Sequence, residues 1–171
     1  GAQMLDSLRL APAAAFYVIH IGGLVYFAGL PAVRDGSAVT AEFRVNTATT
    51  GDQSLSKVGM DDAGNFVVAF TDYNSTSGEV YVQRYNAVGA AQGGNVRVNS
   101  TLISAQELAD IAVHGSSGNF IVIWESVSRD GDDTSVYGQR YNAAGVAQGG
   151  EFQIHTTTAG VQESSKVAYA S

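Results

Sequence analysis

The densest group of potential ligands in this sequence is an acidic loop at residues 130–133. It places Asp130, Asp132 and Asp133 around a single glycine. Oxygen ligands of this kind are the ones that Ca²⁺ prefers, so calcium is the cofactor that the loop would suit. The loop lacks the full spacing of a known calcium loop, and acidic turn residues are commonly only solvated. Calcium at these three carboxylates is therefore one prediction, and solvation is its alternative.

Other arrangements that could support catalysis are sparse. His20, His114 and His155 are far apart in the sequence and occupy different positions of the repeated pattern described below. The sequence contains no Gly-x-Ser-x-Gly elbow, no His-Glu-x-x-His motif and no phosphate-binding loop. A glycosidase needs only two carboxylates that meet in space, and a sequence does not display such a meeting. We expect no enzyme activity and keep a hydrolase as the third-ranked function.

The elements that must position any site are copies of one unit. Residues 42–94 and 95–150 are two copies, and a third begins at Glu151. Phe66 recurs as Phe120, and the other matches follow in the same order, so the period is about 55 residues. Such a period is typical of repeat proteins whose units bury their apolar faces against their neighbours.

Each unit contains four short strands separated by turns. In the first full copy the strands are expected at about 42–46, 54–60, 66–70 and 79–85, with Gly, Asp and Asn between them. The 66–70 run is apolar at every position, as expected for a strand covered on both faces. The predicted fold class is all-β, with tandem four-stranded antiparallel β-blades of a propeller-like kind that are incomplete at both termini.

Residues 13–30 are apolar enough to resemble a membrane segment. They contain no Asp, Glu, Lys or Arg, and their number reaches the threshold for a transmembrane candidate. The two apolar runs at 16–20 and 24–27 nevertheless align with the third and fourth strands of the repeat. Gly22-Gly23 between them suits a hairpin turn and is costly inside a helix. We therefore predict a degenerate blade here, with a membrane or signal segment as the alternative.

One continuous repeat domain follows from this alignment. Its predicted units are residues 1–41 (strands two to four), 42–94, 95–150 and 151–171 (strands one and two). The second strands of the two terminal units are expected at about 5–10 and 164–170. A C-terminal first strand could complete the N-terminal blade, but about three blades is below the usual minimum of four for a closed propeller. The chain is expected to assemble head to tail, to belong to a longer array, or to stack linearly with exposed edges.

Unpaired edge strands promote association between chains, and strand donation satisfies them. The predicted partner is therefore another copy of this chain, with the apolar residues of the terminal units as the self-assembly surface. These residues are Phe16, Val18, Ile19, Val25 and Phe27 on the N-terminal strands, and Phe152, Ile154, Val167 and Tyr169 on the C-terminal strands.

Residues that recur once per unit are predicted to be structural. Arg84 and Arg140 share one repeat position and are expected to pair with a carboxylate of the neighbouring blade. Gln83 and Gln139 share another, where an amide can satisfy backbone groups between strands. Trp124, the only tryptophan, is expected to fill the core rather than to stack on a sugar.

Several motifs together resemble a known class of repeats. They are Gly-Asn-Phe-Val-Val-Ala-Phe at 64–70, Gly-Asn-Phe-Ile-Val-Ile-Trp at 118–124, Tyr-Val-Gln-Arg-Tyr-Asn at 81–86, Tyr-Gly-Gln-Arg-Tyr-Asn at 137–142, and Gly-Gly-Glu-Phe-Gln-Ile at 149–154. This pattern resembles the tandem repeats of large secreted bacterial surface proteins, which are often calcium-binding, adhesin-like or filamentous. The resemblance covers about 42–171 well and 5–41 poorly, and Gly138 departs from it where the other copy has Val82. It implies propeller-like blades and an extracellular or cell-surface location.

Composition narrows the choice of partner. The net charge of −7 and pI near 4.7 disfavour a protein that binds the phosphate backbone of nucleic acids. The predicted function is an extracellular structural β-repeat subunit that assembles into a filament or surface array, with adhesion as an associated role. The alternative is a glycan-binding propeller module, which would need repeated exposed aromatic residues.

Overall fold

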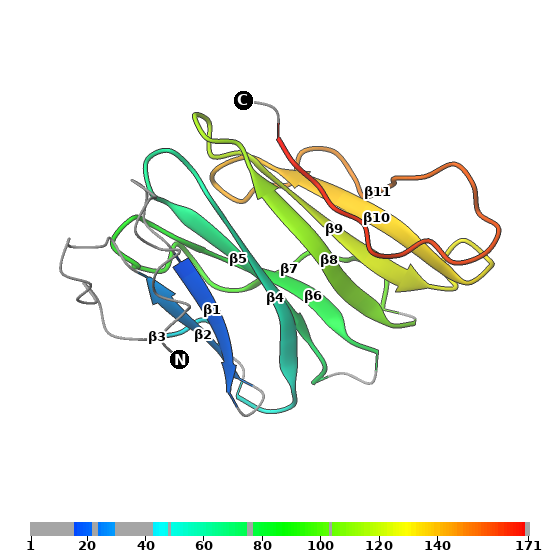
Figure 1. The fold of residues 1–171 in the computed structure, drawn as a ribbon, viewed down its shortest axis with the longest axis horizontal. Coiled ribbons are helices and arrows are strands. Elements are labelled where there is room, and N and C mark those ends of the chain that lie inside the picture. Colours follow the sequence, from blue (N-terminus) through cyan, green and yellow to red (C-terminus); the bar gives the residue numbers. More distant parts are fainter. Residues whose placement is uncertain are drawn as a thin grey trace, which may run out of the picture.

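The computed structural model describes residues 16–21, 24–29, 43–47, 49–74, 77–102 and 104–169. These residues form eleven strands, all paired antiparallel, and contain no helix (Figure 1). The strands are β1 (Phe16–Ile21), β2 (Leu24–Gly29), β3 (Phe43–Arg44), β4 (Gln53–Met60), β5 (Phe66–Asp72), β6 (Glu79–Tyr85), β7 (Val96–Arg97), β8 (Gln106–Val113), β9 (Phe120–Val127), β10 (Thr134–Tyr141) and β11 (Phe152–Gln153). The prediction of an all-β, antiparallel class is confirmed. The predicted strand at about 5–10 lies outside the described residues.

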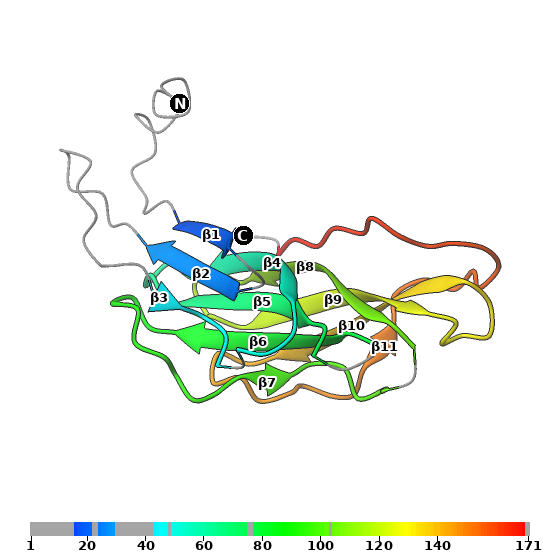
Figure 2. The ribbon, with the colours of Figure 1, turned by 90° about the horizontal axis from the view of Figure 1, so that it is seen from below.

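Three sheets are stacked along the chain. Sheet 1 has the order β1-β2-β3, sheet 2 the order β4-β5-β6-β7, and sheet 3 the order β8-β9-β10-β11. Sheet 2 lies between the other two, with β4 against β1 and β2 on one side and β8 against β4 and β5 on the other (Figures 1 and 2). Each sheet is therefore a meander, and sheets 2 and 3 each pack on the sheet before them.

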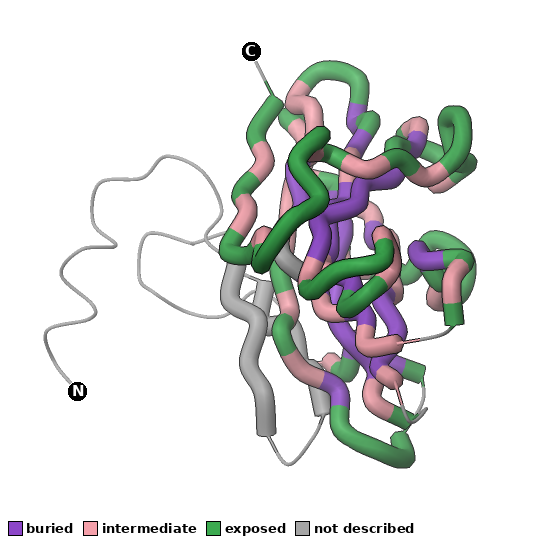
Figure 3. Tube along the Cα trace, turned by 90° about the vertical axis from the view of Figure 1, so that its right-hand side faces the viewer, coloured by how far each residue is buried: buried purple, intermediate pink, exposed green. Residues whose placement is uncertain are grey.

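The core explains why the 66–70 run has no polar position. Val67 and Ala69 face sheet 3 and pack in one cluster with Trp124. Phe66 and Val68, which alternate with them, face sheet 1 and pack with residues such as Val45. Because successive side chains of a strand point to opposite faces, β5 is buried on both sides. Buried positions accordingly follow the strands of sheets 2 and 3 in Figure 3, while their turns are exposed.

Sheet boundaries are displaced by one strand from the predicted units. The first strand of each unit pairs with the sheet before it, so β3 joins β2, β7 joins β6 and β11 joins β10. The turn after β6 causes this pairing, because Asn86 Oδ1 accepts the Ala90 N–H and the Gln92 N–H then bonds the Arg84 carbonyl. That turn folds the chain back along the strand that it has just left. β11 consequently belongs to sheet 3 and does not complete sheet 1.

Pairing registers relate the three sheets position by position. The equivalent rows across the third, fourth and following first strands are Ile19-Tyr26-Arg44, Phe70-Tyr81-Arg97 and Trp124-Tyr137-Gln153. Ile19 therefore stands at the position of Phe70, where the sequence alignment puts His20. Only two residues connect β1 to β2, and this shorter connection displaces the register by one.

An irregularity recurs in the second strand of sheets 2 and 3. The ladder of β4 with β5 shifts just before Lys57, and that of β8 with β9 shifts just before Asp110. Leu55, in the first of these bulges, has a φ of 52°. A left-handed non-glycine residue is uncommon, and an extra residue in one strand increases the local twist. The bulge bends the strand that docks on the preceding sheet.

The buried tyrosines of sheets 2 and 3 make an alkaline limit to stability predictable. Burial raises the pKa of Tyr141, whose ring stacks on Phe120, from its ordinary value to about 12. Below about pH 10 the hydroxyl is protonated in both the native and the unfolded chain, so its full contribution is present. Between about pH 10 and 12 only the unfolded chain loses this proton, so we expect the free energy of unfolding to fall by on the order of 1–3 kcal/mol per such tyrosine.

Urea midpoints measured at intervals from pH 9 to 12, in wild type and in Tyr141→Phe, test this expectation. The variant should lose stability less steeply across that range, because it lacks one phenol that ionises. Tyr85→Phe, at the equivalent position in sheet 2, provides the parallel case, since burial raises the pKa of Tyr85 to about 12 as well. A pH dependence unchanged in both variants would contradict the assignment.

Candidate assembly surface

The C-terminal segment, residues 161–169, runs along the outer side of sheet 3 and bonds residues of β8, β9 and β10 (Figures 1 and 2). Val167 packs there against Ile121, Ile123 and Val136, on the side of sheet 3 that faces away from sheet 2. In the described part of the chain this segment belongs to no strand ladder, although a strand was predicted at about 164–170. It is an extended segment docked on a sheet, and none of the described strands pairs with it.

β8 docks on sheet 2 through contacts with which those of the C-terminal segment can be compared. Two backbone N–H groups near the start of β8 donate across the gap between the sheets. The Gln106 N–H bonds the carbonyl of Ser77 at 3.1 Å, and the Leu108 N–H bonds Oγ1 of Thr71 at 2.9 Å. Thr71 directly follows Phe70 on β5, so the second bond fixes β8 to the central strand of sheet 2.

The C-terminal segment makes the matching bonds to sheet 3. The Gln162 N–H bonds the carbonyl of Thr134 at 2.8 Å, and the Ser164 N–H bonds Oε1 of Glu125 at 2.6 Å. Glu125 directly follows Trp124 on β9, as Thr71 follows Phe70 on β5. Gln162 and Ser164 thus occupy the positions of Gln106 and Leu108 in β8.

Backbone conformation gives a second correspondence. Ser164 has a φ of 57°, close to the 52° of Leu55 in the bulge of β4. Both residues lie two positions after a glutamine, at Gln53 in β4 and at Gln162 in the C-terminal segment. The segment therefore shares the left-handed backbone of the β4 bulge, although no described strand pairs with it.

A glutamine recurs near the start of each second strand, at Gln53, Gln106 and Gln162. In β4, Gln53 Oε1 accepts a hydrogen bond from Asn46 Nδ2 at 3.0 Å. In β8, Gln106 Oε1 accepts one from Trp124 Nε1 at 3.0 Å, and its Nε2 donates to Ser126 Oγ at 2.8 Å. Both amides are fully buried and tie the second strand to neighbouring strands.

In the described part of the chain, the Gln162 side chain makes hydrogen bonds only to residues close to it in sequence. Its Nε2 donates to the Ala159 carbonyl at 3.0 Å, whereas its Oε1 is buried and has no hydrogen-bond partner among the described residues. A buried acceptor without a donor is rare in folded proteins and costs free energy. This glutamine is not among the residues predicted to be structural, although its recurrence at 53, 106 and 162 is visible in the sequence.

The predicted self-assembly residues fall into two groups in the structure. Phe16, Val18, Ile19, Val25 and Phe27 lie in the antiparallel hairpin of β1 and β2, and the structure describes the backbone of these strands but not their side chains. Val167 and Tyr169 lie in the C-terminal segment, where the Tyr169 ring meets His114 edge-on at 5.4 Å between centroids.

Phe152 and Ile154 require a correction. They were predicted on a donated strand, but β11 pairs with β10 of the same chain. A Cβ at Gly138 would lie 3.2 Å from Phe152 Cζ and 3.4 Å from Ile154 Cδ1. Gly138, the departure from the repeat pattern, thus leaves room for these side chains on sheet 3.

The arginines of the repeated strand differ in their surroundings. Arg84 Nη1 donates to the carbonyl of Ala143 in the turn after β10 at 2.9 Å, and its Nη2 donates to the carbonyl of Gln92 in the turn after β6 at 3.1 Å. It bridges two sheets through backbone carbonyls, where a carboxylate had been expected. Arg140, the equivalent residue of sheet 3, is exposed, and its guanidinium lies 5.7 Å from the centre of the Phe152 ring.

Gln83 and Gln139 make equivalent contacts in sheets 2 and 3. Gln83 Nε2 donates to the carbonyl of Gly93 at 3.0 Å, and Gln139 Nε2 donates to that of Gly149 at 3.2 Å. Each amide also bonds the carbonyl of the arginine that follows it. These side chains hold the glycine pair after the turn against the fourth strand.

Two carboxylates of the acidic loop bind protein groups. Asp130 Oδ2 accepts from Gln153 Nε2 at 3.1 Å, and Asp132 Oδ2 accepts from the Gly160 N–H at 2.9 Å. Asp133 is exposed, and among the described residues no group of three or more His, Cys, Asp or Glu side chains is placed to hold a metal ion. Calcium at this loop stays a prediction from sequence, and the geometry supplies a tether for the chain that enters the C-terminal segment.

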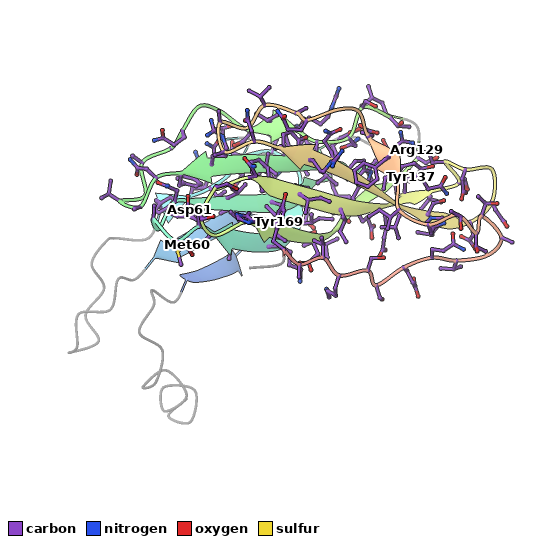
Figure 4. All side chains as sticks on the ribbon, turned by 90° about the horizontal axis from the view of Figure 1, so that it is seen from above. Met60, Asp61, Arg129, Tyr137 and Tyr169 are labelled. Carbon is purple, nitrogen blue, oxygen red and sulfur yellow. The ribbon has the colours of Figure 1, made fainter. Side chains whose placement is uncertain are left out.

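A cation beside this loop was not predicted. Figure 4 shows Arg129 next to Tyr137, with the guanidinium carbon 3.9 Å from the ring centre. Arg129 Nη2 also pairs with Glu151 Oε2 at 2.7 Å. Arg129 has no counterpart in the first full copy of the repeat, so the repeat pattern does not indicate it. It fastens the chain before β11 to sheet 3.

Comparisons with known proteins do not attach the chain to a family. No protein-family model matches it, and no curated protein matches it. In the part of the chain that the structure describes, no helix is long and apolar enough to cross a membrane. The resemblance to repeats of secreted surface proteins accordingly depends on the sequence motifs alone.

Replacing the recurring glutamine should cost more stability at Gln106, whose amide is fully hydrogen-bonded, than at Gln162, whose Oε1 has no partner among the described residues. Gln106→Leu leaves Trp124 Nε1 and Ser126 Oγ without their partner, so we expect a loss of about 2–4 kcal/mol in the free energy of unfolding. Gln162→Leu removes an acceptor that has no donor together with two exposed local bonds from Nε2 to the Ala159 and Gly160 carbonyls, so it should cost less, at most about 1 kcal/mol. Urea unfolding followed by tryptophan fluorescence measures both. Equal losses would contradict the equivalence drawn here.

Truncating the two repeated arginines gives a second matched pair. Arg84→Ala removes one of the bonds between the sheet 2 and sheet 3 units, that to the Ala143 carbonyl, so we expect a loss of about 1 kcal/mol in the free energy of unfolding. Arg140→Ala changes an exposed side chain and should alter monomer stability by no more than about 0.5 kcal/mol. Thermal unfolding at low protein concentration compares them, and a larger effect at Arg140 would contradict the bridging role of Arg84.

Proposed function

We propose that this protein is a structural β-repeat subunit whose stack of sheets extends by docking a further sheet on sheet 3, and that another copy of the chain supplies that sheet. The observation that carries the proposal is the C-terminal segment. It repeats the docking bonds of β8 and the bulge of β4, and it lies on sheet 3 in the position of a second strand. Extended backbone with unpaired hydrogen-bonding groups is a template for an added strand.

The four-stranded units are proposed to be propeller-like blades. The common strand order of sheets 2 and 3, and the packing of each sheet on the one before it, support that description. A contact that joins the tail of one copy to the head of the next closes into a ring or grows into a filament, depending on its rotation. An extracellular or cell-surface site for such an array remains a prediction from the resemblance.

The glycan-binding alternative loses its main candidate. Trp124 is fully buried between sheets 2 and 3, and its indole N–H bonds Gln106, so its ring cannot form a platform for a sugar. No specific observation favours a hydrolase. The structural role is therefore the one that the described contacts support best.

Assembly is measured by sedimentation equilibrium and light scattering over a wide range of concentrations, with electron microscopy of the particles. We expect concentration-dependent association of the wild-type chain. Val167→Asp puts a charge against Ile123 and Val136 and should displace the segment from sheet 3, which weakens association by about tenfold or more. Val161→Asp is the matched control, because Val161 is 53% exposed and should leave association unchanged. A wild-type chain that stays monomeric at all concentrations would overturn the proposal.

A further inference from the structure

We propose that residues 162–169 of one copy pair antiparallel with β1 of a second copy, which forms a mixed sheet of the order C-terminal segment-β1-β2-β3. This inference rests on the proposed function and specifies the strand pair that would join two copies. The mixed sheet would have the strand order of sheet 2, β4-β5-β6-β7.

The choice of β1 follows from the topology of the three sheets. In sheets 2 and 3 the third strand has a neighbour on both sides, because β5 lies between β4 and β6 and β9 lies between β8 and β10. In sheet 1 the equivalent strand is β1, which among the described residues pairs with β2 alone. Among the described residues, sheet 1 thus shows a third strand with no second strand beside it, and the C-terminal segment has no third strand beside it; the second strand predicted at about 5–10 lies outside these residues.

The two parts also agree in how they stack. β8 sits on sheet 2 through the bonds to Ser77 and Thr71 and carries sheet 3 with it. The C-terminal segment already makes the matching bonds to sheet 3. Pairing with β1 would therefore place the sheet 1 of a second copy on sheet 3 in the way that sheet 3 lies on sheet 2. Head-to-tail growth then needs no rearrangement of the docked segment.

The known registers define the register of the new pair. In β4 and β5, Lys57 lies opposite Ala69, and Asp110 lies opposite Ile123 in β8 and β9. Each of these second-strand residues lies four positions after the recurring glutamine, as Lys166 does after Gln162. Val18 occupies the β1 position equivalent to Ala69, since it directly precedes Ile19, the equivalent of Phe70. Lys166 of one copy is therefore placed opposite Val18 of the other.

The absence of cysteine from the chain allows a direct test with engineered thiols. Full-length Val18→Cys and Lys166→Cys are mixed in equal amounts under mild oxidation, and the mixed disulfide is identified by mass spectrometry. Opposed residues of an antiparallel pair lie within disulfide reach, whereas Cα atoms more than about 7 Å apart do not. His20→Cys mixed with Lys166→Cys is the off-register control, two positions along the same strand. We expect about tenfold more mixed disulfide in the first mixture than in the control.

The outcomes separate this inference from the function on which it rests. A disulfide between the Val18→Cys and Lys166→Cys chains, absent when the mixture is denatured in urea, supports the pairing even where association is weak. Association by light scattering without that disulfide overturns the pairing and leaves self-assembly standing. Neither association nor disulfide overturns both. Equal yields of mixed disulfide in the two mixtures overturn the proposed register. If residues of the same chain already pair with β1, no mixed disulfide forms, and this result overturns the pairing.

Discussion

Burial of the central strands on both faces is the constraint on which the rest of the molecule depends. Val67 and Ala69 of β5 need sheet 3, and Phe66 and Val68 need sheet 1. A buried Val or Phe side chain contributes roughly 1.5–3 kcal/mol when it leaves water, so a sheet that lost one neighbour would expose a large apolar face. Stacking is therefore a condition for the stability of each sheet. The same condition applies to sheet 3, whose outer residues Ile121 and Ile123 are covered by the C-terminal segment.

Polar contacts decide how the sheets stack, since apolar burial alone does not fix a register. The bonds from Gln106 and Leu108 into sheet 2 set where β8 lies, and the Gln106 amide ties it to Trp124. A displaced strand would leave these buried groups without partners, which costs more than the bonds themselves contribute. The glutamine that recurs in successive second strands thus helps to fix the register of each strand against its neighbours.

Local pattern was enough to predict the strands, but not their partners. Turn residues and apolar runs located β5, β6, β9 and β10, and the uniformly apolar 66–70 run correctly indicated two covered faces. The assignment of the first strand to the preceding sheet depends on hydrogen bonds made by the turn at Asn86, and no hydrophobic period records these. The one-residue displacement of β1 depends on the length of a connection. The docking of the C-terminal segment depends on Glu125 and Thr134, which are far from it in sequence.

Ser164 gives the docked segment an unusual status. Its left-handed backbone, at a φ of 57°, is a conformation that a free non-glycine residue adopts only at a cost of about 1–2 kcal/mol. In a short unbound peptide that conformation would be rare, so contacts with sheet 3 stabilise it in the docked segment. In the proposed assembly, part of the ordering entropy of strand pairing would thereby be lost during folding of the first chain rather than at the encounter with the second. The docked segment would then already have the conformation that pairing with a further strand requires.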